Sequence, residues 1–326
     1  MVTFKGFIRE LDRVQKQAER QRLRDYKQSL KEQELDSARQ QFEQYTNHLE
    51  YITSFHKRIL EPINWTAIHN RPLPKKPILS DKYQKEAKHR LANYTPSWWK
   101  RLFRLQDKKV SRMKQNIQEA PAKDKALFDE QMALYQQAYA DWFKMSTLSD
   151  RLLKGDISAY QQVFEKFCKP KFKDNLGNSF VMGEYYQKYI QLNITVGDIT
   201  TVPAYSLSLT STGKLSRKNM SISRRFEIYQ DYLCSCALCV VGSVFAKIPV
   251  GYILANLVVK SLNSITGHIE PQTFLSAWIP RQTFDSLNLN CIDPSDCMQN
   301  FMCNMKFSKT KGFMPVDPVR PPDCLK

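Results

Sequence analysis

The sequence is poor in glycine and lacks the short motifs that mark common enzyme active sites. Only 10 of its 326 residues are glycine, against 15 tyrosines and 18 phenylalanines, which favours long helices and few tight loops. No Gly-x-Gly-x-x-Gly, Walker, Gly-x-Ser-x-Gly or His-Glu-x-x-His pattern occurs. His268 is the one histidine after residue 170, so histidine-based nuclease and hydrolase sites lack material there. We therefore expect no catalytic residues, no metal ligands and no cofactor.

Long apolar runs are also scarce. The sequence begins without the apolar stretch of a signal peptide, so we expect a cytoplasmic protein. Residues 232–259 are apolar, but Lys247 and Pro249 interrupt them and leave uncharged runs of 15 and 12 residues. A bilayer span needs about 20 residues. We interpret this region as a buried helix followed by a buried strand, and we expect no membrane partner.

The eight cysteines show no clear metal-binding pattern. Without an export signal we expect them to be reduced thiols. Cys234, Cys236 and Cys239 fall in an apolar helical run, where free cysteine behaves as a small hydrophobic residue. Cys291, Cys297 and Cys303 include no Cys-x-x-Cys pair and have no histidine nearby. We expect them to fill the core, and zinc ligation is the alternative.

Positive charge is abundant and concentrated. The chain has 49 Lys and Arg against 32 Asp and Glu, a net charge of +17. Residues 71–114 hold 14 cations and 3 anions, so this segment supplies 11 of the surplus charges. Such a segment is typical of a contact surface for phosphate or another polyanion. A solubilising helical face is the alternative, and charge alone does not separate the two.

Residues 1–60 indicate a coiled-coil or other helical segment. Two apolar runs with spacings of 3 and 4 flank the polar stretch 19–34: Phe4, Phe7, Leu11, Val14 and Ala18, and then Leu35, Ala38, Phe42, Tyr45, Leu49 and Ile52. The pattern predicts one long helix or two. It leaves open whether the helix forms a homo-oligomer or lies against its own chain. The proline-rich segment 61–80 then predicts an extended connector.

Residues 81–170 indicate a basic helical domain, with helices expected over 81–92, 98–117, 122–153 and 157–168. In the second of these, apolar residues share one face: Trp99, Leu102, Phe103, Val110, Met113 and Ile117. The opposite face carries a row of cations: Arg101, Arg104, Lys108 and Arg112. Such a row can neutralise successive phosphates, and Trp98 at its border can stack on a base. An ordinary amphipathic helix is the alternative.

Residues 171–326 predict a compact α+β domain. Strand-like segments cover 180–182, 189–196, 204–209, 252–259 and 274–279, with a turn at 266–268. A long helix is expected over 224–246. Two short helices are expected to close the domain, the second capped by Asp293.

Two further basic clusters occur in this domain. The first comprises Lys214, Arg217, Lys218, Arg224 and Arg225, in an expected loop and helix start, and no acid lies between Asp198 and Glu227. The free N–H groups of a helix start also favour an anion. The second cluster is Lys306, Lys309 and Lys311. Four carboxylates could assemble a divalent-metal site: Glu184, Asp198, Glu227 and Asp231. Pairing of Glu227 and Asp231 with Arg224 or Arg225 is the alternative.

The sequence resembles a family of uncharacterised bacterial proteins over nearly its whole length. The similarity is carried by residues 209–218, 227–236, 266–270, 293–296 and 306–313, together with the coiled-coil start and residues 61–65. The resemblance implies a bacterial origin and this architecture, without an activity. It also draws attention to 209–236 and 306–313, where the shared motifs coincide with the basic clusters.

These observations favour a non-enzymatic protein that binds nucleic acid, or another polyanion, through the 97–117 helix and the 214–225 cluster. A metal-dependent nuclease with an atypical site in the α+β domain is the first alternative. A coiled-coil scaffold whose charge only keeps it in solution is the second. The sequence does not distinguish DNA from RNA, and it does not fix the partner, the oligomeric state or the pathway.

Overall fold

The computed structural model describes residues 4–95, 105–168 and 180–322, and it separates into two compact units. Unit 1 combines Met1–Ile63 with Gly155–Lys326, and unit 2 consists of Asn64–Lys154. Long helices occupy the N-terminal half, and a mixed sheet with helices occupies the C-terminal part. The expected α+β class is therefore confirmed.

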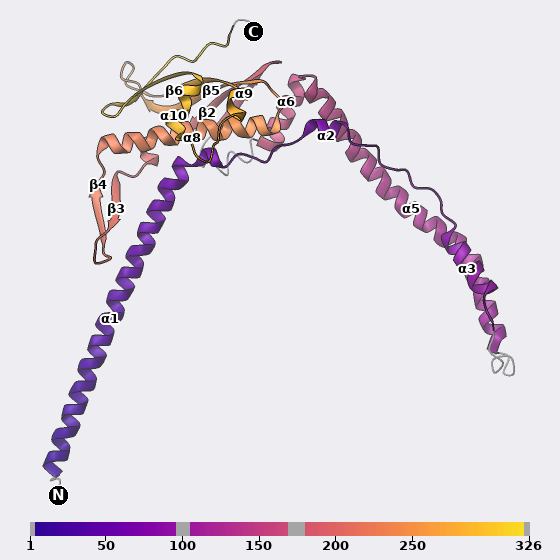
Figure 1. Cartoon of the computed structure of the whole chain (residues 1–326), viewed down its shortest axis with the longest axis horizontal. Coiled ribbons are helices and arrows are strands. Elements are labelled where there is room, and N and C mark those ends of the chain that lie inside the picture. Colours follow the sequence, from indigo (N-terminus) through magenta and orange to yellow (C-terminus); the bar gives the residue numbers. More distant parts are fainter. Residues whose placement is uncertain (1–3, 96–104, 169–179, 323–326) are drawn as a thin grey trace. The chain divides into compact units, whose positions relative to one another are not determined.

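A six-stranded mixed sheet forms the centre of unit 1, in the order β1-β2-β5-β6-β7-β8 (Figure 1). Its strands are β1 (Phe180–Tyr185), β2 (Tyr189–Val196), β5 (Tyr252–Leu262), β6 (Ile269–Pro280), β7 (Met302–Ser308) and β8 (Gly312–Met314). β2 and β5 pair in parallel, and the other neighbours pair antiparallel. A parallel pair needs a long connection, and this one contains helix α8 (Ile222–Lys247).

Helix α8 is buried on all sides along its central turns. Every residue from Tyr232 to Phe245 is buried, so this stretch has no polar face toward water. The helix lies along one face of the sheet (Figure 1). Cys234, Cys236 and Cys239 are at most 1% exposed, as expected for core-filling thiols. Gly242 is required here, because a Cβ at this position would lie 2.3 Å from the Ile59 Cδ1 atom.

Residues 54–63 cover another side of α8 and are tied to it by hydrogen bonds. The backbone N–H groups of His56 and Leu60 donate to the hydroxyl oxygens of Ser235 and Ser243, at 3.0 and 3.2 Å. The N–H of Ile63 donates to the carbonyl of Ala246. The short turn η1 (Phe55–Lys57) lies in this segment. The few polar groups of α8 therefore hold residues 54–63 in one position against this otherwise apolar helix.

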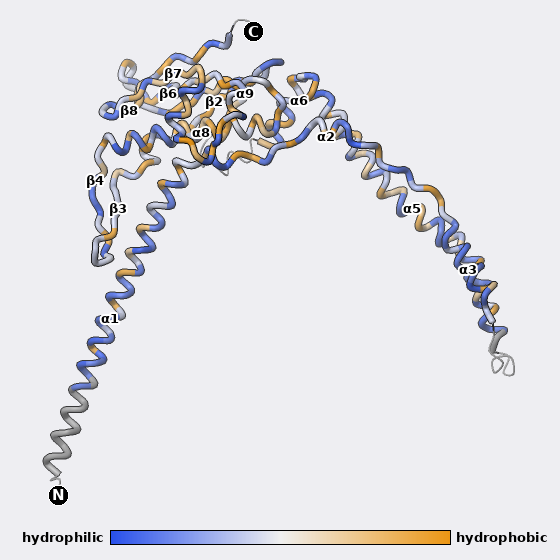
Figure 2. Tube along the Cα trace, viewed as in Figure 1, coloured by the Kyte–Doolittle hydropathy of each residue, from blue (hydrophilic) through white to orange (hydrophobic). Residues whose placement is uncertain are grey.

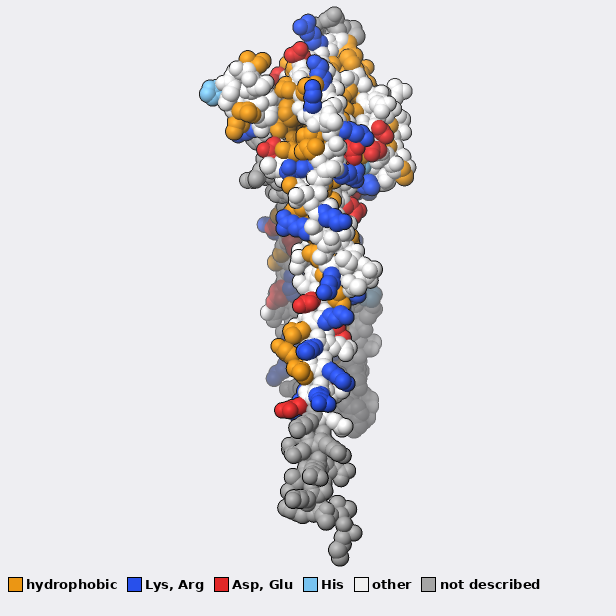
Figure 3. All heavy atoms as spheres, turned by 90° about the vertical axis from the view of Figure 1, so that its left-hand side faces the viewer, with side chains coloured by type: hydrophobic (Ala, Val, Ile, Leu, Met, Phe, Trp, Pro, Cys, Tyr) orange, Lys and Arg blue, Asp and Glu red, His pale blue; other side chains and the backbone are white. Residues whose placement is uncertain are grey.

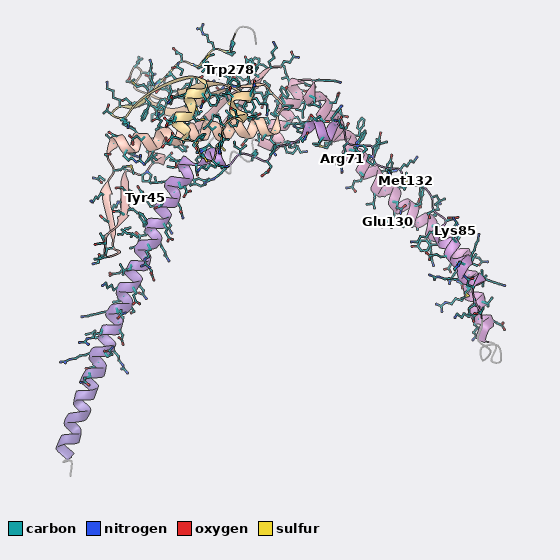
Figure 4. All side chains as sticks on the ribbon, in the orientation of Figure 1. Tyr45, Arg71, Lys85, Glu130, Met132 and Trp278 are labelled. Carbon is teal, nitrogen blue, oxygen red and sulfur yellow. The ribbon has the colours of Figure 1, made fainter. Side chains whose placement is uncertain are left out.

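Helix α1 (Phe4–Thr53) is one continuous element, and its C-terminal half lies against a β-hairpin of the same unit. The hairpin consists of β3 (Tyr205–Leu209) and β4 (Leu215–Asn219). The ring of Tyr45 stacks on that of Tyr205 at 5.9 Å, and its hydroxyl donates to the Tyr205 carbonyl (Figure 4). Ala38 and Ile52, from the second apolar run, are buried. The second apolar run therefore packs against other elements of its own chain.

Short elements complete unit 1: α6 (Ile157–Val163), the π-helical turn η2 (Phe164–Cys168), η3 (Ile199–Thr201), α9 (Arg281–Asp285), α10 (Pro294–Cys297) and η4 (Met298–Asn300). The carboxylate of Asp293 accepts from the N–H groups of Ser295 and Asp296, which confirms it as the cap of α10. The guanidinium of Arg281 donates to the carbonyls of Phe245, Ile248 and Val250. It thereby fixes the chain between α8 and β5.

The described residues of unit 2 form α2 (Trp65–His69), α3 (Lys82–Ala92) and α5 (Leu105–Leu153). Residues 71–80 form an extended connector between α2 and α3, as their prolines predict. Both α2 and α3 lie against α5. Unit 2 is thus a long helix with two shorter helices packed on it.

Several sequence-based expectations about elements were wrong. The break expected between 117 and 122 is absent, because α5 runs through Pro121. Ala120 is buried beside it, and Asp124 accepts two hydrogen bonds from α3, so tertiary contacts hold the helix on either side of the proline. Lys214 lies in a turn, as expected, but Arg217 and Lys218 lie on strand β4 of a hairpin and not in a loop. The domain ends on β7 and β8, and not on helices. Cys291 is exposed, so it does not fill a core.

Within the described residues, α8 is the one helix long and apolar enough to cross a membrane, and most of it is buried inside unit 1. Strand β5 is buried from Ile253 to Leu257. The interpretation of 232–259 as a buried helix and a buried strand is therefore confirmed.

The buried His56 predicts a pH-dependent stability. Its side chain is 2% exposed, its Nδ1 lies 2.8 Å from the Ser235 hydroxyl oxygen, and its Nε2 has no hydrogen-bond partner among the described residues. Burial, assisted by Lys57, lowers the pKa of this imidazole below its ordinary 6.5. Below pH 6.5 the unfolded chain therefore takes up a proton that the folded chain refuses. The neutral His56 therefore contributes its full stabilisation of the folded state above pH 6.5. This stabilisation is lost as the pH falls from 6.5 toward the lowered pKa.

We expect the free energy of unfolding, measured in urea between pH 7.5 and 5, to fall by at most about 1.4 kcal/mol per pH unit from this group. The variant His56→Gln should be less stable at pH 7.5 and should show a flatter dependence. Asp231, whose pKa is raised to about 6, stabilises the fold as the pH falls from 6 to 4, so the comparison with the variant isolates His56. Equal slopes for the two proteins would contradict the assignment.

Candidate nucleic-acid interface

The mutual position of α3 and α5 is fixed by a carboxylate. The side chain of Asp124, on α5, is 2% exposed and accepts from the backbone N–H groups of Tyr83 and Gln84 at 2.8 and 3.1 Å. These N–H groups belong to the first turn of α3, where a helix has no partners of its own for them. Asp124 therefore acts as a cap delivered from a neighbouring helix. The negative charge also lies at the positive end of the α3 dipole.

The connector that precedes α3 is anchored on the same long helix. The indole Nε1 of Trp142 donates to the carbonyl of Arg71 at 2.9 Å. Trp142 also lies beside Tyr139, which contacts Tyr135 and Phe143 in turn. This aromatic row holds one end of the connector, and Asp124 holds the start of α3 at the other. The connector is therefore anchored to α5 at both of its ends, and this fixes where α3 begins.

A groove of about 400 Å³ runs between α3 and α5, and we call it the α3–α5 groove. Its cationic lining comes from both helices: Arg90, Lys109, Arg112 and Lys123. Among the described lining residues, Glu86 is the one carboxylate, and it pairs with Arg90 at 3.5 Å. Lys109 also lies 4.9 Å from the ring centre of Tyr94. The groove offers several cations, an aromatic edge and little opposing charge.

Most acidic residues around the groove are occupied locally. Asp81 pairs with Lys85 and Glu119 with Lys123, each one turn away, and Asp124 caps α3. In the part of unit 2 that the structure describes, no ion pair joins Lys108, Lys109 or Arg112 to a carboxylate. All three are fully or mostly exposed on α5. Their charges therefore remain available to a ligand.

The predicted row of cations on α5 is only partly described. Lys108 and Arg112 are exposed, whereas Val110, Met113 and Ile117 are partly buried, as expected. Trp98, Arg101 and Arg104 lie outside the described residues. The sequence pattern missed that Lys109, Lys123 and Arg90 line one groove, because their convergence depends on the pairing of two helices. The high Lys and Arg density of both segments was its only signal.

The second predicted cluster is divided among different tasks. Lys214 and Lys218 are exposed on the β3–β4 hairpin, whereas the guanidinium of Arg217 lies over the ring of Tyr205 at 3.9 Å. Arg225 donates to the carbonyls of Ile199 and Val202, both at 3.0 Å, and so fixes the chain before β3.

Helix α8 begins beside an ion-pair cluster. Glu227 accepts from Arg224 at 3.2 Å and from Lys309, of the third basic cluster, at 2.7 Å. Both hydrogen bonds lower the pKa of Glu227, and the one from Lys309 has the larger effect. The expected pairing of Glu227 with Arg224 is therefore present. Arg224 is partly neutralised by Glu227, and the guanidinium of Arg225 is engaged by two backbone carbonyls. Lys214 and Lys218 are therefore more available to a ligand than either arginine.

Carboxylates gather at a cavity of about 530 Å³ near the same end of α8, and the contributors are Glu227, Asp231, Asp293 and Asp296. Burial, together with the charge of Asp293, raises the pKa of Asp231 to about 6. Arg224 and Lys309 also line this cavity. Among the residues that the structure describes, no three His, Cys, Asp or Glu side chains are placed to hold a metal ion. Glu184 lies elsewhere, on β1, where its carboxylate accepts from Gln191 and Asn193.

Comparison with known proteins gives no match to a family model, to a curated protein or to a solved structure. This agrees with a resemblance to a family that has no established activity.

The cap formed by Asp124 can be tested by substitution. Asp124→Ala removes both acceptors from the first turn of α3, and we expect unit 2 to lose about 1–2 kcal/mol of stability. Asp124→Asn keeps one acceptor oxygen without the charge, so its loss should be smaller. Asp129→Ala, an exposed position on the same helix, is the control for the charge and should change stability by less than about 0.5 kcal/mol. Thermal unfolding followed by circular dichroism measures all three, and equal effects of the two alanine variants would contradict the assignment.

Proposed function

We propose that unit 2 binds nucleic acid through the α3–α5 groove and the adjacent exposed face of α5, without catalysing a reaction. The observation that carries the proposal is the set of unpaired cations Lys108, Lys109 and Arg112 beside a groove with one carboxylate. Unit 2 holds 19 Lys and Arg against nine Asp and Glu, so it carries 10 of the 17 surplus charges. A duplex or single strand presents the opposite charge at regular spacing.

The geometry suits backbone contacts more than reading of bases. Lys108 and Arg112 are four residues apart, about 6 Å along a helix axis. Arginine can hold a phosphate with two parallel hydrogen bonds, and lysine supplies a point charge. We therefore expect binding with little sequence preference. Lys214 and Lys218, on the β3–β4 hairpin of unit 1, are a second contact in this proposal.

The nuclease alternative receives no support from the described carboxylates, since none of them form a metal-binding group. A cytoplasmic location accords with the proposal, because nucleic acid is abundant there.

Charge reversal on α5 tests the proposal. Lys108→Glu with Arg112→Glu should weaken binding to DNA or RNA at low salt by at least about tenfold, because two phosphate contacts become repulsive. For duplex DNA, log affinity of the unmodified protein should fall linearly with log salt, at about −0.9 per phosphate contacted. The variant should show a slope smaller by about 2. Filter binding or fluorescence anisotropy over several salt concentrations measures both quantities.

The matched control is Lys144→Glu with Lys306→Glu, which makes the same change in net charge at exposed positions away from the groove. We expect this control to change affinity by less than about threefold. If the two double variants lose affinity equally, the groove is not the site. If the unmodified protein binds neither DNA nor RNA at low salt, the proposal is wrong.

Helix α1 supports a second proposal, self-association of two copies. Leu23, Tyr26 and Leu30 are 55, 61 and 41% exposed and follow the spacing of 3 and 4. They lie in the stretch 19–34 that the sequence pattern treats as polar, and this part of α1 is mostly hydrophilic around them (Figure 2). A helical stretch of this length gains little stability in water without a partner. These three exposed residues are the surface through which we propose that two α1 helices associate.

The charges of α1 favour an antiparallel pair. Residues 4–31 hold nine cations and four anions, whereas residues 32–53 hold one cation and five anions. An antiparallel arrangement places the basic half of each helix beside the acidic half of the other. A parallel arrangement would place like charges together.

Replacing Leu23, Tyr26 and Leu30 with Gln should convert a dimer into a monomer, measured by light scattering of the full chain. The control replaces Leu73, Ile78 and Leu79 with Gln; these apolar residues of unit 2 are 53, 86 and 59% exposed, and we expect no change in mass. Because the pairing depends on opposite charges, high salt should shift the unmodified protein toward monomer. A monomer under all conditions would rule out the pair.

A further inference from the structure

Unit 1 contains an aromatic cavity that the proposed functions do not use. It has a volume of about 460 Å³ and lies between the start of α8, the end of β5, the start of β6 and the β7–β8 turn. Four aromatic rings line it: Phe226, Tyr229, Phe274 and Phe313. The volume falls in the range of small-molecule sites, which are apolar cavities with a few polar groups.

Phe313 organises the aromatic lining. Its ring stacks on Phe274 at 5.8 Å, meets Tyr229 edge-on at 5.9 Å and contacts Phe307 at 5.2 Å. The preceding Gly312 has φ +73°, and a Cβ there would lie 2.8 Å from the Phe226 ring. Both facts require glycine. The β7–β8 turn, part of a segment that carries the family resemblance, thus builds the cavity wall.

The charged groups at the cavity favour an anion. Lys260 and Lys311 line it and are exposed, and neither is joined to a carboxylate of the described residues. Among the described lining residues Asp198 is the one acid, and its Oδ1 accepts from the N–H and hydroxyl of Thr200. Two lysines against one carboxylate leave the lining net positive. Ser261 donates to Gln272 and adds no charge. An apolar body and two lysines together match an amphipathic anion.

Apolar surface continues from the cavity to the tip of the β5–β6 hairpin. Leu262 and Ile269 line the cavity and are 67 and 74% exposed, and Ile265 in the turn is 93% exposed. The space-filling view shows apolar side chains beside Lys and Arg on this part of unit 1 (Figure 3). Exposed apolar patches of this kind mark binding sites in soluble proteins. A ligand with an extended apolar chain can therefore follow the surface outward.

We infer that this cavity binds a single-chain amphipathic carboxylate, such as a fatty acid, with its acid at Lys260 and Lys311 and its alkyl chain on the aromatic rings. The lysines select against cations. The continuous apolar strip selects a chain over a compact anion.

Isothermal titration calorimetry with fatty carboxylates below their micelle concentrations tests the inference on the full chain. Dodecanoate should bind at one site per chain. Each methylene added between octanoate and dodecanoate should improve affinity about fourfold, because it is removed from water. Dodecyltrimethylammonium, with the same chain and the opposite charge, should bind at least about tenfold more weakly. Acetate should show no binding.

Lys260→Gln with Lys311→Gln should weaken dodecanoate binding at least about tenfold, since hydrogen bonds to charged groups are lost. Both residues are exposed, so the fold should be unchanged by circular dichroism. Lys306→Gln, an exposed lysine of the same segment outside the cavity, is the control and should bind as the unmodified protein does.

Three results would overturn the inference. They are a failure of dodecanoate to saturate the protein, equal affinities for the double variant and the control, and binding of the ammonium amphiphile as tight as that of dodecanoate. Vesicles of anionic lipid provide a separate arm. If the protein sediments with vesicles but binds no free dodecanoate, the surface meets a membrane and the inferred ligand is wrong.

Discussion

The need to bury helix α8 on every side determines the architecture of unit 1. An apolar helix of this length cannot leave any face in water, so the sheet covers one side and residues 54–63 cover another. Burial alone would accept many arrangements. Ser235 and Ser243 restrict the choice, because their hydroxyl groups accept N–H donors of one particular segment, and Gly242 leaves room for Ile59. A few polar atoms and one missing side chain thus give the apolar contact its register.

The same burial connects distant parts of the chain. Residues 54–63 directly follow α1, so their attachment to α8 brings the end of α1 to the sheet domain, where Tyr45 contacts the β3–β4 hairpin. Residues 64–154 are then inserted between two parts of one compact unit. This organisation lets unit 2 differ in character: it has little core of its own and carries most of the surplus charge.

The sequence predicted the elements whose pattern is local. Strand β2 has the expected bounds, and α8 and β5 were expected from apolar runs with clear ends. The misses depend on contacts between distant residues. Continuation of α5 through Pro121 goes with the burial of Ala120 and Asp124. Strands β4 and β7 contain many polar residues and β8 has three residues, so all three depend on hydrogen bonds from their partner strands. The α3–α5 groove was invisible for the same reason: helical periodicity places Arg112 on a face, but it does not tell which helix lies beside it.

The acids of unit 2 show how its surface stays positive. Asp124 accepts hydrogen bonds from the first turn of α3, and Asp81, Glu86 and Glu119 each pair with a lysine or arginine one turn away. These four acids therefore do not neutralise Lys108, Lys109 or Arg112. Like charges held along two helices repel one another and weaken a unit that already has a small core. A bound polyanion would remove that repulsion, and any ligand that binds only the folded state also stabilises it. If unit 2 binds nucleic acid as we propose, the same surplus charge that repels itself along α3 and α5 would couple the stability of unit 2 to its ligand.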